Sequence, residues 1–412
     1  MHGKSVVAGV CLGLGILVAG TLAQQPPPSK KSARPMESPS ALAEKAERLR
    51  SVYQAPPTTW PAPDVDPGVA WSEIGLLPPA PEPAGNPGNP AKVELGKRLF
   101  FDPRVSGSGQ IACASCHDPD LGWADGRTTS YGHRREPLRR NSPGLMNIGY
   151  MPALFWDGRA SSLEDQARQV LLNPQEMSAT PDSIVKEVSA VPEYRDAFRE
   201  AFHDDAITVE SVSKALAAFE RSIVGGRSPF DKFLKGDRTA LSDEAVRGMD
   251  LFRGSARCMN CHNGPTFSDG QFHDLGLSYY GRELEDLGRY KVTEKAEDVG
   301  RFRTPSLRNI GATGPYMHNG LFELTGVLNA YNAGMATLRR KPHQAEDPLF
   351  PTKSPHLRPL GLNKQDIADL KAFLESLTEP KLRVRAPELP GLASHSARRT
   401  TDADAPAAAS RP

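Results

Sequence analysis

The chain has almost no excess charge of either sign and a low content of apolar residues. Its 50 Lys and Arg nearly balance 49 Asp and Glu, which leaves a formal net charge of +1. A surface with this balance does not favour nucleic acid, so no nucleic-acid partner is expected. Apolar residues make up 38%, alongside 36 Gly and 38 Pro. This composition indicates ordered domains with flanking segments that cannot hold a core.

A hydrophobic run long enough to predict a transmembrane helix is also missing. The apolar stretch at residues 6–19 follows His2 and Lys4 and precedes small residues at 21–23. This order is typical of a cleaved signal peptide, here residues 1–23, and it predicts an exported protein of the periplasm. An uncleaved membrane anchor is the alternative.

Cysteine is scarce, and its placement is regular. Of five cysteines, Cys11 lies in the predicted signal peptide, and the other four form two copies of a Cys-x-x-Cys-His motif. Two thiols at this spacing can bond both vinyl groups of one haem while the next residue presents its imidazole to the iron. Two covalent haem c groups are therefore predicted, with a disulfide within each pair or a zinc site as alternatives. The motif residues are Cys113, Cys116 and His117, then Cys258, Cys261 and His262.

The two motifs lie in an internal duplication. A Leu-Phe pair precedes each motif, an Asp-Gly pair follows it, and Pro-x-Leu-x-Asn-Ile-Gly recurs at residues 143–149 and 305–311. A repeat of this length predicts two homologous domains, at residues 90–235 and 236–380.

Helical patterns dominate both predicted domains. Ser161 with Glu164 predicts a capped helix that runs to about residue 172, Thr208 predicts a helix that ends near Gly225, and Asn363 predicts a late one. No alternating pattern typical of strands is present.

The segments outside the domains are rich in Pro, Ser and Ala. Residues 24–89 are expected to be a Pro-rich linker with little fixed structure, interrupted by one short helix at 42–53. Residues 381–412 are expected to form a disordered tail.

An electron carrier needs only the haems, whereas an enzyme needs an open iron and acid–base groups above it. Glu176 is one candidate, ten residues after Gln166 and directly after a loop that begins Asn173-Pro174. By composition alone, Glu176 is more often a surface carboxylate.

Residues 90 to 380 resemble the bacterial di-haem cytochrome c peroxidases and their relative MauG. The likeness rests on both haem motifs, the block at 155–160, Gln166 with Glu176, and the block at 304–320. It implies a mainly α fold of two cytochrome c-like domains, each with one covalent haem, flanked by disordered Pro-rich tails. It further implies that the N-terminal haem is peroxidatic, with Glu176 as acid–base catalyst and Gln166 as its hydrogen-bonding partner. Trp156 would then carry electrons between the haems.

The resemblance also proposes axial ligands. His133 matches a histidine that binds the peroxidatic iron in the resting enzyme and leaves when the other haem is reduced, although its neighbours differ from the usual loop. The second iron takes Met in the peroxidases and Tyr in MauG. Counting from Glu323 places Tyr331 at that position, with Met335 as the alternative.

A calcium ion between the domains is implied as well, with Asn141 as side-chain ligand and Thr313 and Pro315 as carbonyl donors. The function expected is a peroxidase-type oxidoreductase that reduces hydrogen peroxide with electrons from a small exported cytochrome c or cupredoxin. One alternative is a MauG-like enzyme that oxidises side chains of a partner protein through high-valent iron. The other is a non-enzymatic electron-transfer cytochrome. The resemblance also allows a homodimer.

Overall fold

The computed structural model describes residues 34–381 and 384–391, and these are mainly helical. The predicted signal peptide and most of the predicted tail lie outside the described residues. Within the described part of the chain, no helix is long and apolar enough to cross a membrane. The helices are α1 (Pro39–Tyr53), α2 (Pro90–Phe101), α3 (Leu163–Leu172), α4 (Pro181–Ser189), α5 (Pro192–Phe202), α6 (Val209–Ser222), α7 (Pro229–Leu234), α8 (Asp243–Arg253), α9 (Tyr290–Thr293), α10 (Leu324–Asn332) and α11 (Lys364–Ser376). Two short strands, β1 (Phe272–Asp274) and β2 (Arg301–Arg303), pair in antiparallel fashion.

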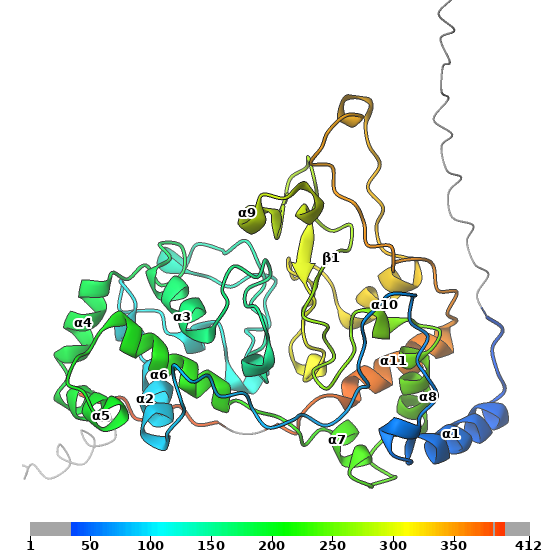
Figure 1. Cartoon of the computed structure of the whole chain (residues 1–412), viewed down its shortest axis with the longest axis horizontal. Helices are drawn as coiled ribbons and strands as arrows, with labels where there is room; N and C mark the ends of the chain where they lie inside the picture. Colours follow the sequence, from blue (N-terminus) through cyan, green and yellow to red (C-terminus); the bar gives the residue numbers. More distant parts are fainter. Residues whose placement is uncertain (1–33, 382–383, 392–412) are drawn as a thin grey trace, which may run out of the picture.

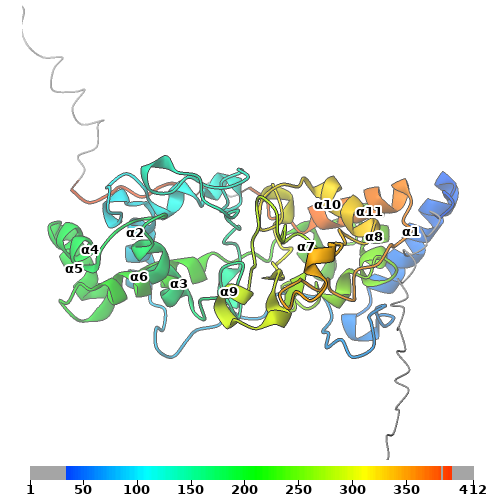
Figure 2. The ribbon, with the colours of Figure 1, turned by 90° about the horizontal axis from the view of Figure 1, so that it is seen from above.

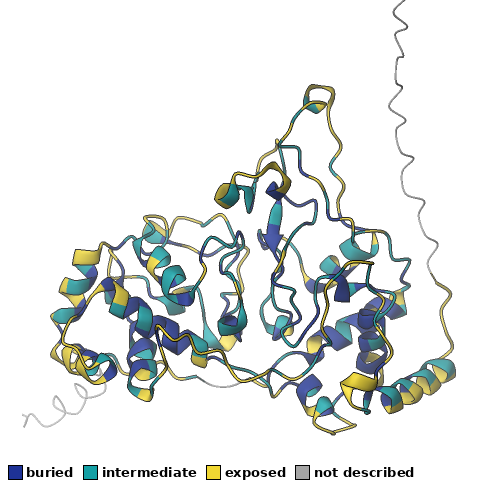
Figure 3. Ribbon diagram, in the orientation of Figure 1, coloured by how far each residue is buried: buried dark blue, intermediate teal, exposed yellow. Residues whose placement is uncertain are grey.

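Two lobes lie side by side, as both ribbon views show (Figure 1; Figure 2). The N-terminal lobe holds α2 to α6, and the C-terminal lobe holds α1, α8, α10 and α11. Each lobe has its own buried cluster, which Figure 3 shows as dark blue segments inside yellow outer surfaces. Both clusters centre on three contacting aromatic rings: Phe100, Trp123 and Phe219 in one, and Phe252, Phe267 and Phe373 in the other.

Each lobe is built on a close crossing of two helices that requires glycine. A Cβ on Gly96 of α2 would lie 1.9 Å from the carbonyl oxygen of Ala215 in α6. A Cβ on Gly248 of α8 would lie 1.9 Å from the carbonyl oxygen of Asp369 in α11. The two glycines hold equivalent positions, three residues before the Leu-Phe pair of each repeat. The internal duplication is therefore repeated in the packing.

The predicted helix caps are confirmed at two of three positions. The side chains of Thr208 and Asn363 cap α6 and α11. The cap of α3 is Ser162 instead of Ser161, because the Ser162 side chain accepts a hydrogen bond from the amide of Asp165. Glu164 does not complete a capping box, since it pairs with Arg221.

The expectation that residues 24–89 have little fixed structure is wrong for the described part, residues 34–89. Helix α1 begins three residues earlier than predicted, and Trp60 and Ile74 are buried in the C-terminal core. The segment has no core of its own, but its apolar side chains pack into the core of the C-terminal lobe. Arg253 of α8 holds it in place through Glu73 and the carbonyl of Pro61.

The described part of the C-terminal tail also makes contacts. Val384 packs against the N-terminal core, and Arg104 donates a hydrogen bond to the carbonyl of Pro390 at 2.8 Å. Residues 384–391 thus return to the first lobe after α11 has completed the second.

Candidate functional site

Each lobe contains a pocket that opens over its Cys-x-x-Cys-His turn. The turns are short 3-10 helices, Cys113–Ser115 and Cys258–Asn260. In both, the amide of the motif histidine donates to the carbonyl of the first cysteine, at 3.0 Å for His117 and 2.8 Å for His262. We call the two cavities the His117 pocket and the His262 pocket. Each is lined by both cysteines of its motif and by its histidine.

A backbone carbonyl orients each motif histidine. His117 Nδ1 lies 2.9 Å from the carbonyl oxygen of Trp123, and His262 Nδ1 lies 2.9 Å from that of Phe267. A carbonyl can only accept, so Nδ1 carries the proton and Nε2 keeps the lone pair that binds a metal. Burial lowers the pKa of both histidines, which favours the neutral, ligating form.

The residues that supply these carbonyls have left-handed backbones, with φ of 64° at Trp123 and 55° at Phe267. This conformation is uncommon for bulky residues and is maintained where the surrounding structure requires it. Here it aims the carbonyl at the motif histidine in both lobes. Both residues lie two positions before the Asp-Gly pair of their repeat, and sequence reasoning missed their role.

The four motif cysteines are free of disulfides. Among the described residues, one group of three possible metal ligands occurs, Cys261 with Asp269 and His273. It uses only one cysteine of its pair and therefore does not match a zinc site built on Cys-x-x-Cys. Two thiols and a neutral imidazole on the wall of a mainly apolar pocket fit a covalently bound haem in each lobe.

The predicted acid–base pair lies in one pocket only. Gln166 of α3 and Glu176 line the His117 pocket, and neither reaches the His262 pocket. Glu176 is half-buried, and the desolvation of its carboxyl raises the pKa of that group. Asn173 Nδ2 donates to Glu176 Oε1 at 3.1 Å. The carboxyl is thus held beside the cavity in a setting that favours a protonated or proton-accepting role. The surface reading of Glu176 does not describe this geometry.

His133 stands at the edge of this pocket. Its neighbour Gly132 lines the cavity, whereas His133 itself is not among the lining residues. The amide of His133 donates to the carbonyl of Gln175 at 2.9 Å, and its buried Nδ1 has no hydrogen-bond partner within the described residues. The predicted ligation of iron by His133 stays a prediction.

Trp156 lies between the lobes and lines both pockets. Its Nε1 donates to the carbonyl of Asn141 at 2.9 Å. Its ring lies 6.5 Å from that of His318, which stacks on Phe302 at 3.7 Å. The position between the pockets is the one that an electron bridge requires. Phe302 lies outside the sequence blocks used above, and His318 lies in the block at 304–320 but received no role from the sequence.

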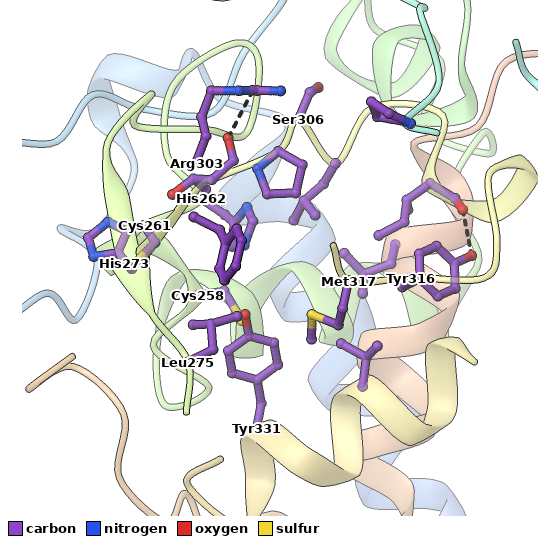
Figure 4. A pocket seen from close by; sticks show the side chains of 18 of the residues that line it. Cys258, Cys261, His262, His273, Leu275, Arg303, Ser306, Tyr316, Met317 and Tyr331 are labelled. Atoms are coloured by element: carbon purple, nitrogen blue, oxygen red, sulfur yellow. Dashed lines mark hydrogen bonds between the residues drawn. The ribbon is translucent and has the colours of Figure 1, made fainter. Parts of the chain in front are cut away.

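The His262 pocket contains Tyr331 and not Met335. Tyr331 rises from α10 toward Cys258 and His262, as Figure 4 shows. Burial raises the pKa of its phenol, which the nearby thiols raise further. Met335 is buried after the end of α10, outside the residues that line the pocket. Met317 points its sulfur into the same cavity and is a thioether that sequence reasoning did not consider (Figure 4).

The three predicted calcium ligands all line one pocket. Asn141, Thr313 and Pro315 line the His262 pocket, and Asn141 lines the His117 pocket as well. Gly314-Pro315 is a cis peptide bond. The Asn141 Nδ2 donates to the carbonyl of Arg127 at 2.9 Å, so its Oδ1 is the atom that a cation would use.

Comparisons with known proteins agree with this geometry. The family model of the di-haem cytochrome c peroxidases matches residues 90–239. The methylamine utilization protein MauG of Methylorubrum extorquens is 41% identical over 314 residues, which cover 75% of this chain and 84% of that protein. The cytochrome c551 peroxidase of Nitrosomonas europaea is 37% identical over 328 residues, with 78% and 92% covered.

Two solved structures show the same fold. A MauG-like protein associated with microbial copper homeostasis has a TM-score of 0.67 and 32% identity, and the match covers 75% of this chain and 95% of that one. The diheme peroxidase BthA from Burkholderia thailandensis has a TM-score of 0.62 and 25% identity, with 78% and 95% covered.

Proposed function

The chain belongs to the di-haem cytochrome c peroxidase family, and we propose that it is an exported enzyme that reduces hydrogen peroxide to water with electrons from a small redox protein. The observation that carries the proposal is the difference between the two pockets. Both have the haem-binding turn, but only the His117 pocket holds the carboxyl of Glu176 and the amide of Gln166. One pocket is thus equipped for proton transfer and the other for electron transfer.

The residues of both pockets fit haem c, which would be held by thioethers from each cysteine pair and by the Nε2 atoms of His117 and His262. When bound, a haem in the His117 pocket would supply the iron and the two-electron redox chemistry that the reduction of peroxide needs. The protein residues manage the protons. Glu176 Oε2, opposite the oxygen held by Asn173, accepts the proton of the near peroxide oxygen and returns it to the leaving one. Overall, peroxide, two protons and two electrons give two waters.

Electrons would enter through the His262 pocket and cross to the His117 pocket by way of Trp156. The position of Trp156 on the walls of both cavities supports this path. We expect the donor to be a small exported cytochrome c or cupredoxin. A calcium ion held by Asn141 and the carbonyls of Thr313 and Pro315 would stabilise the contact between the lobes along the same path.

A second candidate function keeps the peroxide chemistry and changes the substrate to side chains of a partner protein, as in the MauG-like alternative. Tyr331 favours it, because a phenol and not Met335 faces the His262 pocket. A purely electron-transferring cytochrome is disfavoured by the Glu176 carboxyl that lines the His117 pocket.

Peroxide should be added to the mature holoprotein in two states, fully oxidised and half-reduced, and followed by optical and electron paramagnetic spectra. A gated peroxidase reacts after half-reduction and releases water with oxidation of the donor. Rapid reaction of the oxidised form would instead support the MauG-like function and exclude gating by His133. No reaction in either state would contradict both enzymatic functions.

A further inference from the structure

Arg303 is a buried cation without an anion. It ends β2, its side chain is 4% exposed, and it lines both pockets. Its Nε donates to the carbonyl of Phe155 at 3.2 Å. Its Nη1 donates to the carbonyl of Thr304 at 3.3 Å and to the sulfur of Met151 at 3.2 Å. Its Nη2 has no hydrogen-bond partner among the described residues.

The other buried arginines of the described chain show how unusual this is. Each of them forms an ion pair with a carboxylate, in contrast to Arg303. The pairs are Arg50 with Asp243, Arg247 with Asp369, Arg253 with Glu73, Arg257 with Asp66, and Arg308 with Asp231.

An unpaired buried guanidinium is costly. Desolvation of such a charge in a protein interior costs several kcal/mol, and a thioether is a weak acceptor that does not offset it. Burial lowers the pKa of Arg303 to about 10, so the side chain is still charged near neutral pH. The site therefore favours an anionic ligand that enters from the pockets.

We propose that Arg303 binds the propionate carboxylates of both haems and so links the two cofactors electrostatically. The inference rests on the proposed function, because it requires a haem in each pocket. A haem held at its vinyl edge by the cysteines presents its two propionates at the opposite edge. In the view of Figure 4, Arg303 lies at the top of the His262 pocket, on the far side of His262 from Cys258 and Tyr331. The planar guanidinium is suited to bidentate contact with carboxylates.

Arg303 also holds the bridge between the lobes. Its backbone amide donates to the carbonyl of Trp156 at 2.8 Å, and its side chain contacts the carbonyl of the preceding Phe155. A single residue from the C-terminal lobe thus fixes the backbone of the proposed electron bridge. Binding of propionates by Arg303 would couple haem position to the position of Trp156.

The test compares Arg303→Gln and Arg303→Lys holoproteins with the wild type by redox titration of both haems. Removal of the cation leaves propionate charge uncompensated, which favours the oxidised iron. We expect both reduction equilibria of Arg303→Gln to shift about tenfold toward the oxidised form, which is 59 mV lower for a one-electron couple. Arg303→Lys keeps the charge and should shift less. Arg301→Gln, on the same strand, is the matched control and should shift neither, because Arg301 pairs with Asp298.

Unchanged reduction potentials at both haems of Arg303→Gln, or a change at only one haem, would overturn the proposal that Arg303 binds the propionates of both. If Arg303→Gln does not mature, resonance Raman spectra of Arg303→Lys decide the question through the propionate bending modes. These modes should move in both haems, and wild-type frequencies in Arg303→Lys would overturn the proposal. The haem content of the wild type distinguishes failure of this proposal from failure of the proposed function. If the wild type holds two haems and the potentials of Arg303→Gln do not move, only the role of Arg303 is contradicted. If the wild type holds fewer than two haems, the proposed function is contradicted.

Discussion

Substitution of Gly248 by Ala should destabilise the C-terminal lobe, although alanine is the better helix former. The added Cβ would lie 1.9 Å from the carbonyl oxygen of Asp369, 2.5 Å from its carbonyl carbon and 2.8 Å from Cβ of Phe373. Ordinary contacts begin near 3.4 Å, so α8 and α11 must separate by about 1.5 Å. The atoms that obstruct are backbone, which no rotamer change can move away.

The magnitude follows from two opposing effects. Overpacking of a tight core costs about 1–3 kcal/mol, and a rigid backbone obstacle belongs at the upper end. Replacement of a helical glycine by alanine stabilises the helix by up to about 1 kcal/mol. A net loss of about 2 kcal/mol lowers the melting temperature of a lobe of this size by roughly 4–8 °C. The aromatic contact between Phe252 and Phe373, now 5.3 Å between centroids, should loosen as well.

Thermal unfolding of the holoproteins provides the assay, with two companion variants. Gly96→Ala meets the carbonyl of Ala215 at the same 1.9 Å and should behave like Gly248→Ala. Gly326→Ala, at an exposed position of α10, meets no atom within 4 Å and should stabilise the protein by up to about 1 kcal/mol. A Gly248→Ala variant that melts at or above the wild-type temperature, or that matches Gly326→Ala, would contradict the predicted clash between α8 and α11.

Three further predictions concern the pockets and the pH response. Glu176→Gln should slow peroxide consumption in stopped-flow assays by about 10²–10⁴-fold, whereas Glu193→Gln, exposed on α5, should not; equal rates would contradict the acid–base role. Tyr331→Phe should alter the electron paramagnetic spectrum of the second haem and Met335→Leu should not, while the reverse result would identify Met335 as the ligand. Burial raises the pKa of Asp274 from 3.8 to about 6. Between these two values the folded protein keeps a proton that the unfolded chain releases. The free energy of unfolding should therefore fall by about 3 kcal/mol between about pH 4 and pH 6 and then stay level. Asp274→Asn should flatten the plot of melting temperature against pH over this window, and an unchanged slope would refute the assignment.

The features that could be predicted from the sequence are those encoded by local spacing. The Cys-x-x-Cys-His turns require only five consecutive residues, and the caps at Thr208 and Asn363 lie three residues from the amides they bind. The pairing of Gln166 with Glu176 in one pocket was predicted through family resemblance, since their ten-residue separation alone defines no geometry.

The features that sequence reasoning missed depend on contacts between distant segments. The docking of residues 34–89 is one example, because polyproline composition describes the segment alone and not the hydrophobic surface of the domain that receives it. Arg303 is another. The residues around Arg303 in the sequence do not set it apart from other arginines. What distinguishes it is that it is buried, lines both pockets and forms no ion pair with a carboxylate of the described residues.

The haem content of the mature polypeptide is the measurement that tests the account most directly. Iron analysis and the alkaline pyridine spectrum of purified protein should give two haems per chain, and denaturation should not release them, because thioether bonds hold each one. A value of one haem or none, or haem that dissociates on unfolding, would contradict the assignment of both pockets and with it the proposed chemistry.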